Sequence, residues 1–375
     1  MKANYNLLIL LPLFGLMSLG CSSTSDDTVS KSSCSTLLCR AAKYSLFVAD
    51  IDGANLSLIK TSSYQDMTHP RVSGDKSWVA YTTYHDLNSS KCATLDQAYL
   101  NTEIRVIKMT GADDKSLIGP VAGKLNSNNY WIGTSNEFTY LSGAPASLKL
   151  YRATVNSSMN VVSGPTQIAV PGTVIPMDPS SNATTNKIVF SGLYNPGGGY
   201  IKSIFMMNLS DSSNLVGLSV GRDRAGTPII CENSNCANIM ENDPKISPDG
   251  SKVAFMRQVP SSGVNGFGWH IFVVPVASPQ NEVDISYSTL GSDTHKNDVL
   301  PEWVSNSKII FSTIDFGAAN IVSKNVYTMN TDGTGRTKIS LPDGFLYADI
   351  YPFTDSNGKS RIILSAEKIG ATCIP

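Results

Sequence analysis

The stretch DPKISPDGSKVAFMR, from Asp243 to Arg257, decides the fold of this 375-residue chain. The Ser-Pro-Asp-Gly at its centre suits a tight turn, because Pro presets φ, Asp bonds its own backbone and Gly adopts a positive φ. An alternating apolar run follows this turn. The stretch therefore predicts two antiparallel strands joined by a short connection.

Weaker copies of this stretch recur along the chain at intervals of about 50 to 65 residues. They begin at His69, Asn129, Asp178, Leu300 and Asp349. Repeats of this length are typical of propellers and repeat arrays. We therefore interpret each copy as the first strand pair of one repeated unit.

A second element lies between the copies and also predicts two strands around a polar turn. It begins at Ser45, Glu103, Ser147, Lys202, Trp269 and Asn325. Together the two elements give six four-stranded units, and no segment shows sustained helical periodicity. The chain opens with a second pair and closes with a first pair, so one unit would combine both ends of the chain. The sequence predicts an all-β, six-bladed β-propeller, closed by pairing the N- and C-terminal strands in one blade.

The Pro-x-x-Ser-Pro-Asp-Gly pattern at Pro244–Gly250, followed by an apolar strand and a second strand pair, resembles the TolB-type six-bladed β-propeller family. The similarity extends from about Lys43 to Lys368 and is sharpest at Pro244–Phe255, Pro301–Phe311 and Val326–Lys338. TolB is a periplasmic partner in the Tol–Pal envelope system. The resemblance therefore implies an interaction role in the cell envelope, by analogy of fold.

The N-terminus is similar to a bacterial lipoprotein signal. Lys2 supplies a positive charge, and Leu7–Leu19 is apolar but short for a membrane span. The resemblance implies that Cys21 becomes the lipidated first residue, although an ordinary secretory signal is the alternative. Ser22, in place of Asp, implies an outer-membrane destination, facing the periplasm or the cell surface. The domain prediction is therefore a signal peptide at 1–21, a flexible tether at 22–42 and a propeller at 43–375.

Six cysteines remain once Cys21 is assigned to the lipid, and an even number fits an oxidising compartment. The disulfide candidates are Cys34, Cys39, Cys92, Cys231, Cys236 and Cys373. A local Cys231–Cys236 bridge is one hypothesis, and pairing of an N-terminal cysteine with Cys373 is another. A metal site is the competing interpretation, but the paired C-x-x-C spacing that it needs is missing.

His69 is the most informative of the four histidines, because it precedes the Pro that we expect to open an inner strand. In TolB-like propellers these positions face the mouth of the central channel. We predict a channel-mouth site that binds a cation or a polar ligand. Its candidate residues are His69, Asn129, Asp178, Asp243 and Asp349. The alternative is that these short side chains cap backbone N–H groups at strand starts.

Other motifs favour structural roles. Gly217–Gly221 matches G-x-S-x-G, but the residues that follow are poor helix formers, and a nucleophile elbow needs a helix there. Asp50–Gly53 and Asn330–Gly333 resemble calcium loops but lack the full pattern, so we expect hairpin turns. The four tryptophans are expected to pack between blades; they are Trp78, Trp131, Trp269 and Trp303.

The leading hypothesis is a non-enzymatic scaffold with no catalytic residue, no metal and no cofactor. Its expected partner is an envelope protein or a peptidoglycan-associated component, and its membrane contact is through the lipid anchor only. The net charge of −1 and the 16% of charged residues argue against a nucleic-acid partner. Two alternatives stay open. One is a polysaccharide lyase-like propeller with a channel metal, using His69, His270 and His295; the other is a surface adhesion lipoprotein.

Overall fold

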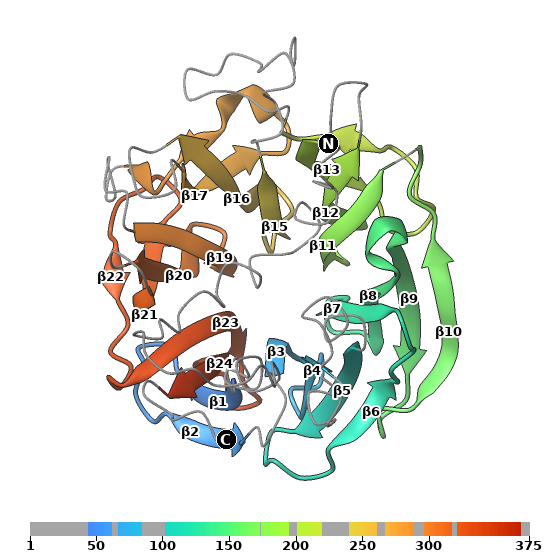
Figure 1. Cartoon of the computed structure of the whole chain (residues 1–375), viewed down its shortest axis with the longest axis horizontal. Coiled ribbons are helices and arrows are strands. Elements are labelled where there is room, and N and C mark those ends of the chain that lie inside the picture. Colours follow the sequence, from blue (N-terminus) through green and yellow to red (C-terminus); the bar gives the residue numbers. More distant parts are fainter. Residues whose placement is uncertain are drawn as a thin grey trace, which may run out of the picture.

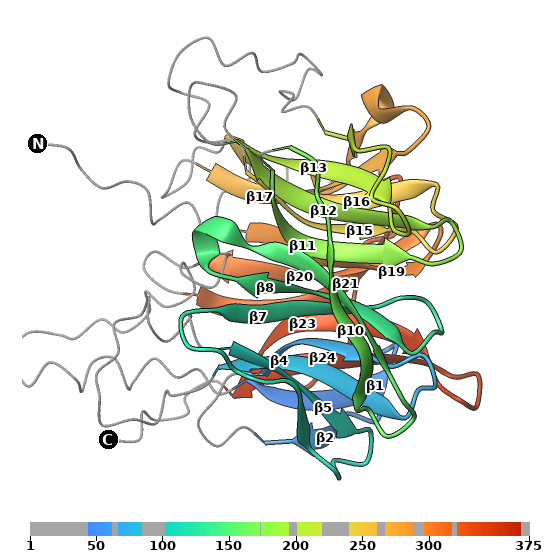
Figure 2. The ribbon, with the colours of Figure 1, turned by 90° about the vertical axis from the view of Figure 1, so that its right-hand side faces the viewer.

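The structure, a computed structural model, describes residues 44–61, 67–84, 102–172, 174–194, 201–219, 240–260, 267–287, 296–316 and 321–368. In these residues the chain forms six four-stranded antiparallel sheets around a central axis (Figure 1). Figure 2 shows the ring from its side, with the strands of all blades running between its two faces. The predicted all-β, six-bladed propeller is confirmed.

We number the blades by their order along the chain and give the strands of each from the axis outward. Blade 1 contains β23 (Phe345–Thr354), β24 (Ser360–Lys368), β1 (Ser45–Asp50) and β2 (Ser57–Lys60). Blade 2 contains β3 (Met67–Val72), β4 (Trp78–Tyr84), β5 (Thr102–Lys108) and β6 (Lys115–Ile118). Blade 3 contains β7 (Leu125–Trp131), β8 (Glu137–Gly143), β9 (Lys149–Val155) and β10 (Val161–Ile168).

The second half of the ring follows the same order. Blade 4 contains β11 (Ile175–Asn182), β12 (Lys187–Tyr194), β13 (Ile201–Asn208) and β14 (Val216–Gly217). Blade 5 contains β15 (Glu241–Ile246), β16 (Lys252–Pro260), β17 (Phe267–Pro275) and β18 (Val283–Asp284). Blade 6 contains β19 (Lys296–Ser305), β20 (Lys308–Phe316), β21 (Ile321–Asn330) and β22 (Thr337–Lys338). Two short 3₁₀ turns complete the described elements, at Pro145–Ser147 and Pro279–Asn281.

Blade 1 combines the first and the last described strands of the chain. β1 pairs with β24 without interruption, from Ser45 opposite Ala366 to Asp50 opposite Arg361. The Lys359 ammonium lies 2.7 Å from the Asp50 carboxylate and adds an ion pair at one end of this ladder. The inner strands of all six blades contact their neighbours around the axis, β23 and β3 included. The ladder between β1 and β24 therefore completes the ring.

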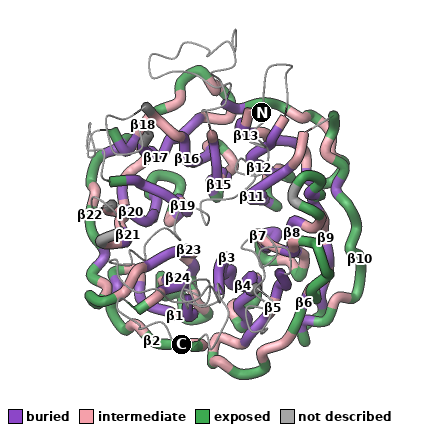
Figure 3. Tube along the Cα trace, in the orientation of Figure 1, coloured by how far each residue is buried: buried purple, intermediate pink, exposed green. Residues whose placement is uncertain are grey.

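The hydrophobic core is divided among the spaces between blades. Figure 3 shows buried residues along the inner and central strands and exposed residues along the outermost strands. Trp78 of blade 2 and Trp131 of blade 3 share one core cluster, and Trp269 and Trp303 lie in the two clusters between blades 5 and 6. The indole N–H groups of Trp131 and Trp303 donate to the carbonyls of Arg71 and Lys245 in the preceding blades. The expectation that the tryptophans pack between blades is confirmed.

Turns also join neighbouring blades. The β1–β2 turn of blade 1 lies against the chain just after β22 of blade 6, where the Ser340 N–H donates to the Asp52 carbonyl. Gly53 in this turn has a φ of +92°, and a Cβ at this position would lie 2.7 Å from the Ser340 carbonyl carbon. Glycine therefore allows both the left-handed backbone and the close approach of the two blades.

Candidate functional site

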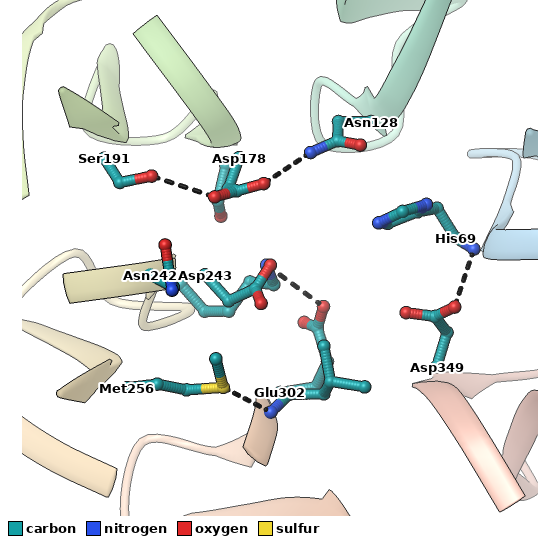
Figure 4. Close-up of polar contacts among 12 residues, drawn as sticks. His69, Asn128, Asp178, Ser191, Asn242, Asp243, Met256, Glu302 and Asp349 are labelled. Atoms are coloured by element: carbon teal, nitrogen blue, oxygen red, sulfur yellow. Dashed lines mark hydrogen bonds and ion pairs between the residues drawn. The ribbon is translucent and has the colours of Figure 1, made fainter. Parts of the chain in front are cut away.

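Each inner strand contains a β-bulge at an equivalent place, where two of its residues face one residue of the second strand; β19 has a further irregularity between Trp303 and Ser305. In five blades the first bulge residue has a φ between 48° and 57°. These residues are His69, Asn128, Asp178, Asp243 and Leu300. In blade 1 the two bulge residues are Ala348 and Asp349. Bulges redirect side chains, and Figure 4 shows His69, Asn128, Asp178, Asp243 and Asp349 facing a common space.

We call these five side chains the bulge ring, and they correct the predicted alignment. Asn128, and not Asn129, occupies the place of His69 in blade 3, while Asp349 is the second bulge residue of blade 1. The expectation that these positions open the inner strands was also wrong, because β3 already begins at Met67. Pro is tolerated at the second bulge position because a bulge on an edge strand demands no ladder N–H.

The members of the bulge ring bond to neighbouring blades. Asp349 Oδ2 accepts the backbone N–H of His69 at 3.2 Å, and Asn128 Nδ2 donates to Asp178 Oδ1 at 2.6 Å. The other Asp178 oxygen accepts Ser191 Oγ at 2.9 Å and Lys202 Nζ at 3.2 Å. Asp349 therefore caps a backbone N–H group, as the alternative interpretation expects, whereas Asp178 bonds to side chains.

Asn129 has a different environment from the bulge ring. Its side chain is buried, and its Oδ1 accepts a long hydrogen bond of 3.5 Å from Thr82 Oγ1. Its Nδ2 has no hydrogen-bond partner in the described part of the chain. Asn129 therefore contributes to the contact between blades 2 and 3 and does not belong to the bulge ring.

Two neighbouring carboxylates of the ring differ in proton affinity. Burial acts to raise the pKa of Asp178, but the charges of Lys202 and Lys245 outweigh it and lower this pKa to about 2. Burial and the nearby Asp178 carboxylate instead raise the pKa of Asp243. Lys245 Nζ, at 3.8 Å from Asp243 Oδ1, is too distant for a strong hydrogen bond and only partly offsets that rise.

A second layer of charged and aromatic groups adjoins the ring. Arg71 of blade 2 donates to Glu302 of blade 6 at 2.7 Å, and both side chains are buried. The Arg71 guanidinium lies over the rings of Tyr130 and Tyr351, at 5.4 and 5.1 Å from their centroids. Lys245 also faces Glu302, at 3.8 Å. Burial raises the pKa of Glu302 despite these cations, and it raises the pKa of Tyr351 to about 12.

This second layer was missed in the sequence, although a signal was present. Arg71, Lys245 and Glu302 each follow directly after a bulge proline, where a strand buried in a hydrophobic core would carry an apolar residue. The pattern marks charged positions on the inner strands. It does not tell which blades exchange charges, because the pairing depends on the ring geometry.

The G-x-S-x-G serine has a structural role within the described residues. Ser219 is buried, accepts the N–H of Ile204 at 2.9 Å and donates to Glu241. Ser286 accepts the N–H of Ile271 at 2.9 Å in the next blade, which repeats the contact. The serine therefore satisfies a backbone N–H of β13, which fits the structural role expected from the absence of a helix-forming sequence after the motif. Val220 and Gly221 lie outside the described residues.

The two calcium-like segments form hairpin turns, as predicted. The N–H of Gly53 donates to the Asp50 carbonyl, and the N–H of Gly333 donates to the Asn330 carbonyl. His270 lies away from the bulge ring, at the β17–β18 pair, where its Nδ1 is 2.8 Å from Asp284 Oδ2.

Several predicted residues lie outside the part that the structure describes. These are His295, the lipidation candidate Cys21 and all six disulfide candidates, Cys34, Cys39, Cys92, Cys231, Cys236 and Cys373. Among the described side chains, no group of three or more His, Cys, Asp and Glu residues is arranged to hold a metal ion. A search of the same residues for long apolar helices finds none that could span a bilayer.

Comparison with known proteins identifies the architecture. No family model matches the chain, and none of the curated proteins matches it by sequence. A solved structure of a candidate TolB from Agrobacterium tumefaciens superposes with a TM-score of 0.53 at 13% identity, covering 86% of this chain and 98% of that chain. The fold is that of a TolB-like six-bladed propeller.

Two further structures are similar in fold. The hydrazine synthase of Kuenenia stuttgartiensis has a TM-score of 0.54 at 11% identity; the match covers 92% of this chain and about half, 51%, of that one. An oligogalacturonate lyase from Vibrio parahaemolyticus has a TM-score of 0.45 at 11% identity, covering 84% of this chain and 76% of that chain. At these identities the similarity concerns the fold alone.

Proposed function

We propose that this TolB-like propeller is a non-enzymatic, lipid-anchored scaffold of the cell envelope that binds a protein or a polar ligand at its bulge ring. The observation that carries the proposal is the convergence of bulge side chains from separate blades on one space (Figure 4). Such a ring offers donors and acceptors in fixed positions on a rigid support, which is what selective binding of a polar group needs.

The partners of these side chains favour binding over catalysis. The Asp178 carboxylate is held by Ser191, Asn128 and Lys202, and Glu302 is held by Arg71. A general base needs a poised proton acceptor within reach of a substrate, and a nucleophile needs an adjacent base. Asp178 and Glu302 are instead paired with cations, so a ligand would bind by exchanging hydrogen bonds with them.

The envelope location belongs to the same proposal. Its support is the lipoprotein-like segment at 1–21 and the tether-like composition of 22–42, with the propeller from 43 to 375. Lipidation at Cys21 would anchor the propeller to the outer membrane, facing the periplasm or the cell surface. Cys21→Ala is expected to move the protein from the membrane fraction to the soluble envelope fraction, and incorporation of a labelled fatty acid tests the anchor directly.

Crosslinking in intact cell envelopes tests the binding role. The wild-type protein should recover the same envelope partner in repeated purifications, and the double variant His69→Ala/Asp243→Asn should lose it. Asp332→Asn is the matched control, because Asp332 lies in the exposed β21–β22 turn and bonds only within that turn in the described structure. Absence of any reproducible partner would contradict the binding role. Equal recovery by the double variant would place the binding surface elsewhere.

Protease treatment of intact cells separates the two faces of the membrane. Digestion of the propeller would indicate surface display and favour a role in adhesion. Full protection, together with digestion after the outer membrane is opened, would support a periplasmic partner such as a peptidoglycan-associated protein.

A further inference from the structure

Lys202 and Asn242 bring an amine and a side-chain amide together between blades 4 and 5. The Lys202 ammonium, on β13, donates a hydrogen bond to Asn242 Oδ1 on β15. An isolated parallel bridge between Lys202 and Met240 fixes the two backbone segments side by side. The relative exposed areas of Lys202 and Asn242 are only 3% and 5%, so bulk water is largely excluded from their contact.

A lysine is not needed to join blades at this position. In blade 2 the corresponding residue is Thr102, whose hydroxyl bonds to the backbone of Asn126 in blade 3. In blade 5 it is Trp269, whose backbone N–H donates to Asn297 Oδ1 in blade 6 at 2.6 Å. Both contacts are made without burying an amine. Lys202 differs from both in burying an ammonium, which is costly unless it is paired.

A carboxylate completes the group. Asp178 Oδ2 lies 3.2 Å from Lys202 Nζ, and Figure 4 shows Asp178 facing the same space as Asn242 and Asp243. An amine, a carboxamide and a carboxyl group that share a buried space are the components of amide exchange. The fold holds them together permanently, which replaces a bimolecular encounter by an intramolecular one.

We propose that Lys202 and Asn242 are joined by a self-formed amide bond between their side chains. The step starts with transfer of a proton from the Lys202 ammonium to the Asp178 carboxylate. The neutral amine then attacks Cγ of Asn242, and the Nζ–Cγ bond forms. The Asp178 carboxyl returns its proton to Nδ2, and the Cγ–Nδ2 bond breaks, so that ammonia leaves. Of the two protons left on Nζ, one is released to the ammonia to form ammonium, and the other stays as the amide N–H. No oxidant, metal or other reactant is required.

The first step of this sequence is uphill. Transfer of the proton to Asp178 opposes the low pKa of this carboxyl, about 2, so the neutral amine and the neutral acid form only transiently. The resting state is the ion pair, since Lys202 holds the pKa of Asp178 low. The exchange is therefore expected to be slow, and to reach completion because the ammonia diffuses away.

The bond would link two residues of consecutive blades that lie 40 positions apart in the chain. It would close a covalent loop around the segment 203–241, which contains the connection from β14 to β15. A cross-link of this kind restricts the unfolded chain as a disulfide does, and reduction does not reverse it. The inference does not depend on the ligand proposed above.

Peptide mapping of the purified full-length protein tests the bond. After reduction, unfolding and trypsin digestion, an unmodified chain yields separate fragments 188–202 and 225–245. A cross-linked chain resists cleavage after Lys202, and fragment 188–222 appears joined to 225–245 at the summed mass minus one ammonia. Recovery of only the two separate fragments from folded wild-type protein would overturn the proposal.

Variants assign the bond to its atoms. Lys202→Arg keeps the charge but removes the reactive amine, and Asp178→Asn removes the proton carrier; each is expected to abolish the joined fragment. Lys324→Arg is the matched control, because Lys324 is also buried but faces the Tyr44 hydroxyl at 3.0 Å and is expected to leave the joined fragment intact. A joined fragment that persists in Lys202→Arg would show that another lysine is responsible and would refute the assignment.

Discussion

The Asp349 carboxylate accepts the backbone N–H of His69 at 3.2 Å, although the two residues lie 280 positions apart in the chain. This bond joins the inner strand of blade 1 to that of blade 2, next to the place where the ring closes. Asp349→Ala would leave the buried N–H without this acceptor, which costs about 1–3 kcal/mol. Urea denaturation should show this loss of unfolding free energy, while Asp343→Ala, at an exposed position just before the same strand, should change stability little. Equal stability of the two variants would contradict the role of the bond.

Removal of one partner from the Arg71–Glu302 pair should lower the free energy of unfolding more than the loss of the Asp349 hydrogen bond does. Loss of one member of a buried ion pair costs about 3–5 kcal/mol. The loss of unfolding free energy in Arg71→Ala should lie near the lower end of this range, because Lys245 still faces Glu302 at 3.8 Å. The double variant Arg71→Met/Glu302→Gln should regain most of the loss, since no charge is then left unpaired. A double-mutant cycle by guanidinium denaturation measures both effects, and an additive result would show that the two groups do not interact.

Asp243 should make stability depend on pH in a defined direction. Its pKa is raised in the fold by burial and by Asp178, so the folded state binds its proton more tightly than the unfolded chain does. Its contribution therefore favours folding below the unfolded pKa and is lost as pH rises through the folded pKa. Asp243→Asn imitates the protonated form and should be more stable than the wild type at neutral pH, with the difference shrinking on acidification. Thermal unfolding across this pH range provides the measurement. An asparagine variant that is less stable at neutral pH would contradict the assignment.

Gly53→Ala should test the close approach between blades 1 and 6. A non-glycine residue at positive φ costs roughly 1–2 kcal/mol by itself. At Gly53 a Cβ would also lie 2.7 Å from the Ser340 carbonyl carbon, so the loss should exceed that range. Gly358→Ala is the matched control, because Gly358 has a φ of +79° in the same blade but a Cβ added there would meet no atom within 4 Å. Equal losses of unfolding free energy for the two variants would show that the blade contact is unimportant.

The period of the repeats was sufficient to predict the blades, because turn residues and alternating strands are local features. Blades 3 and 4, whose copies lack the Pro-Asp-Gly turn, were predicted from spacing and strand pattern. The alignment of the candidate site was less accurate. Proline is the second bulge residue in blades 2, 4, 5 and 6, but the bulge of blade 3 has Asn129 there, so the sequence did not mark Asn128 as the residue that faces the axis. The contact between Arg71 and Glu302 was inaccessible to sequence reasoning, because it depends on how closed blades face one another.

The pairing of β1 with β24 also sets an order of events during synthesis. The ribosome produces β1 first among the described strands and β24 last, so the blade that contains both must wait for the final part of the chain. Contacts between such distant segments form slowly, because the entropy of closing a long loop is lost before the contacts can stabilise the chain. Until then β1 and β2 present unpaired strand edges, which are prone to association with other chains. A nascent chain of this protein therefore exposes these edges until the last blade is available.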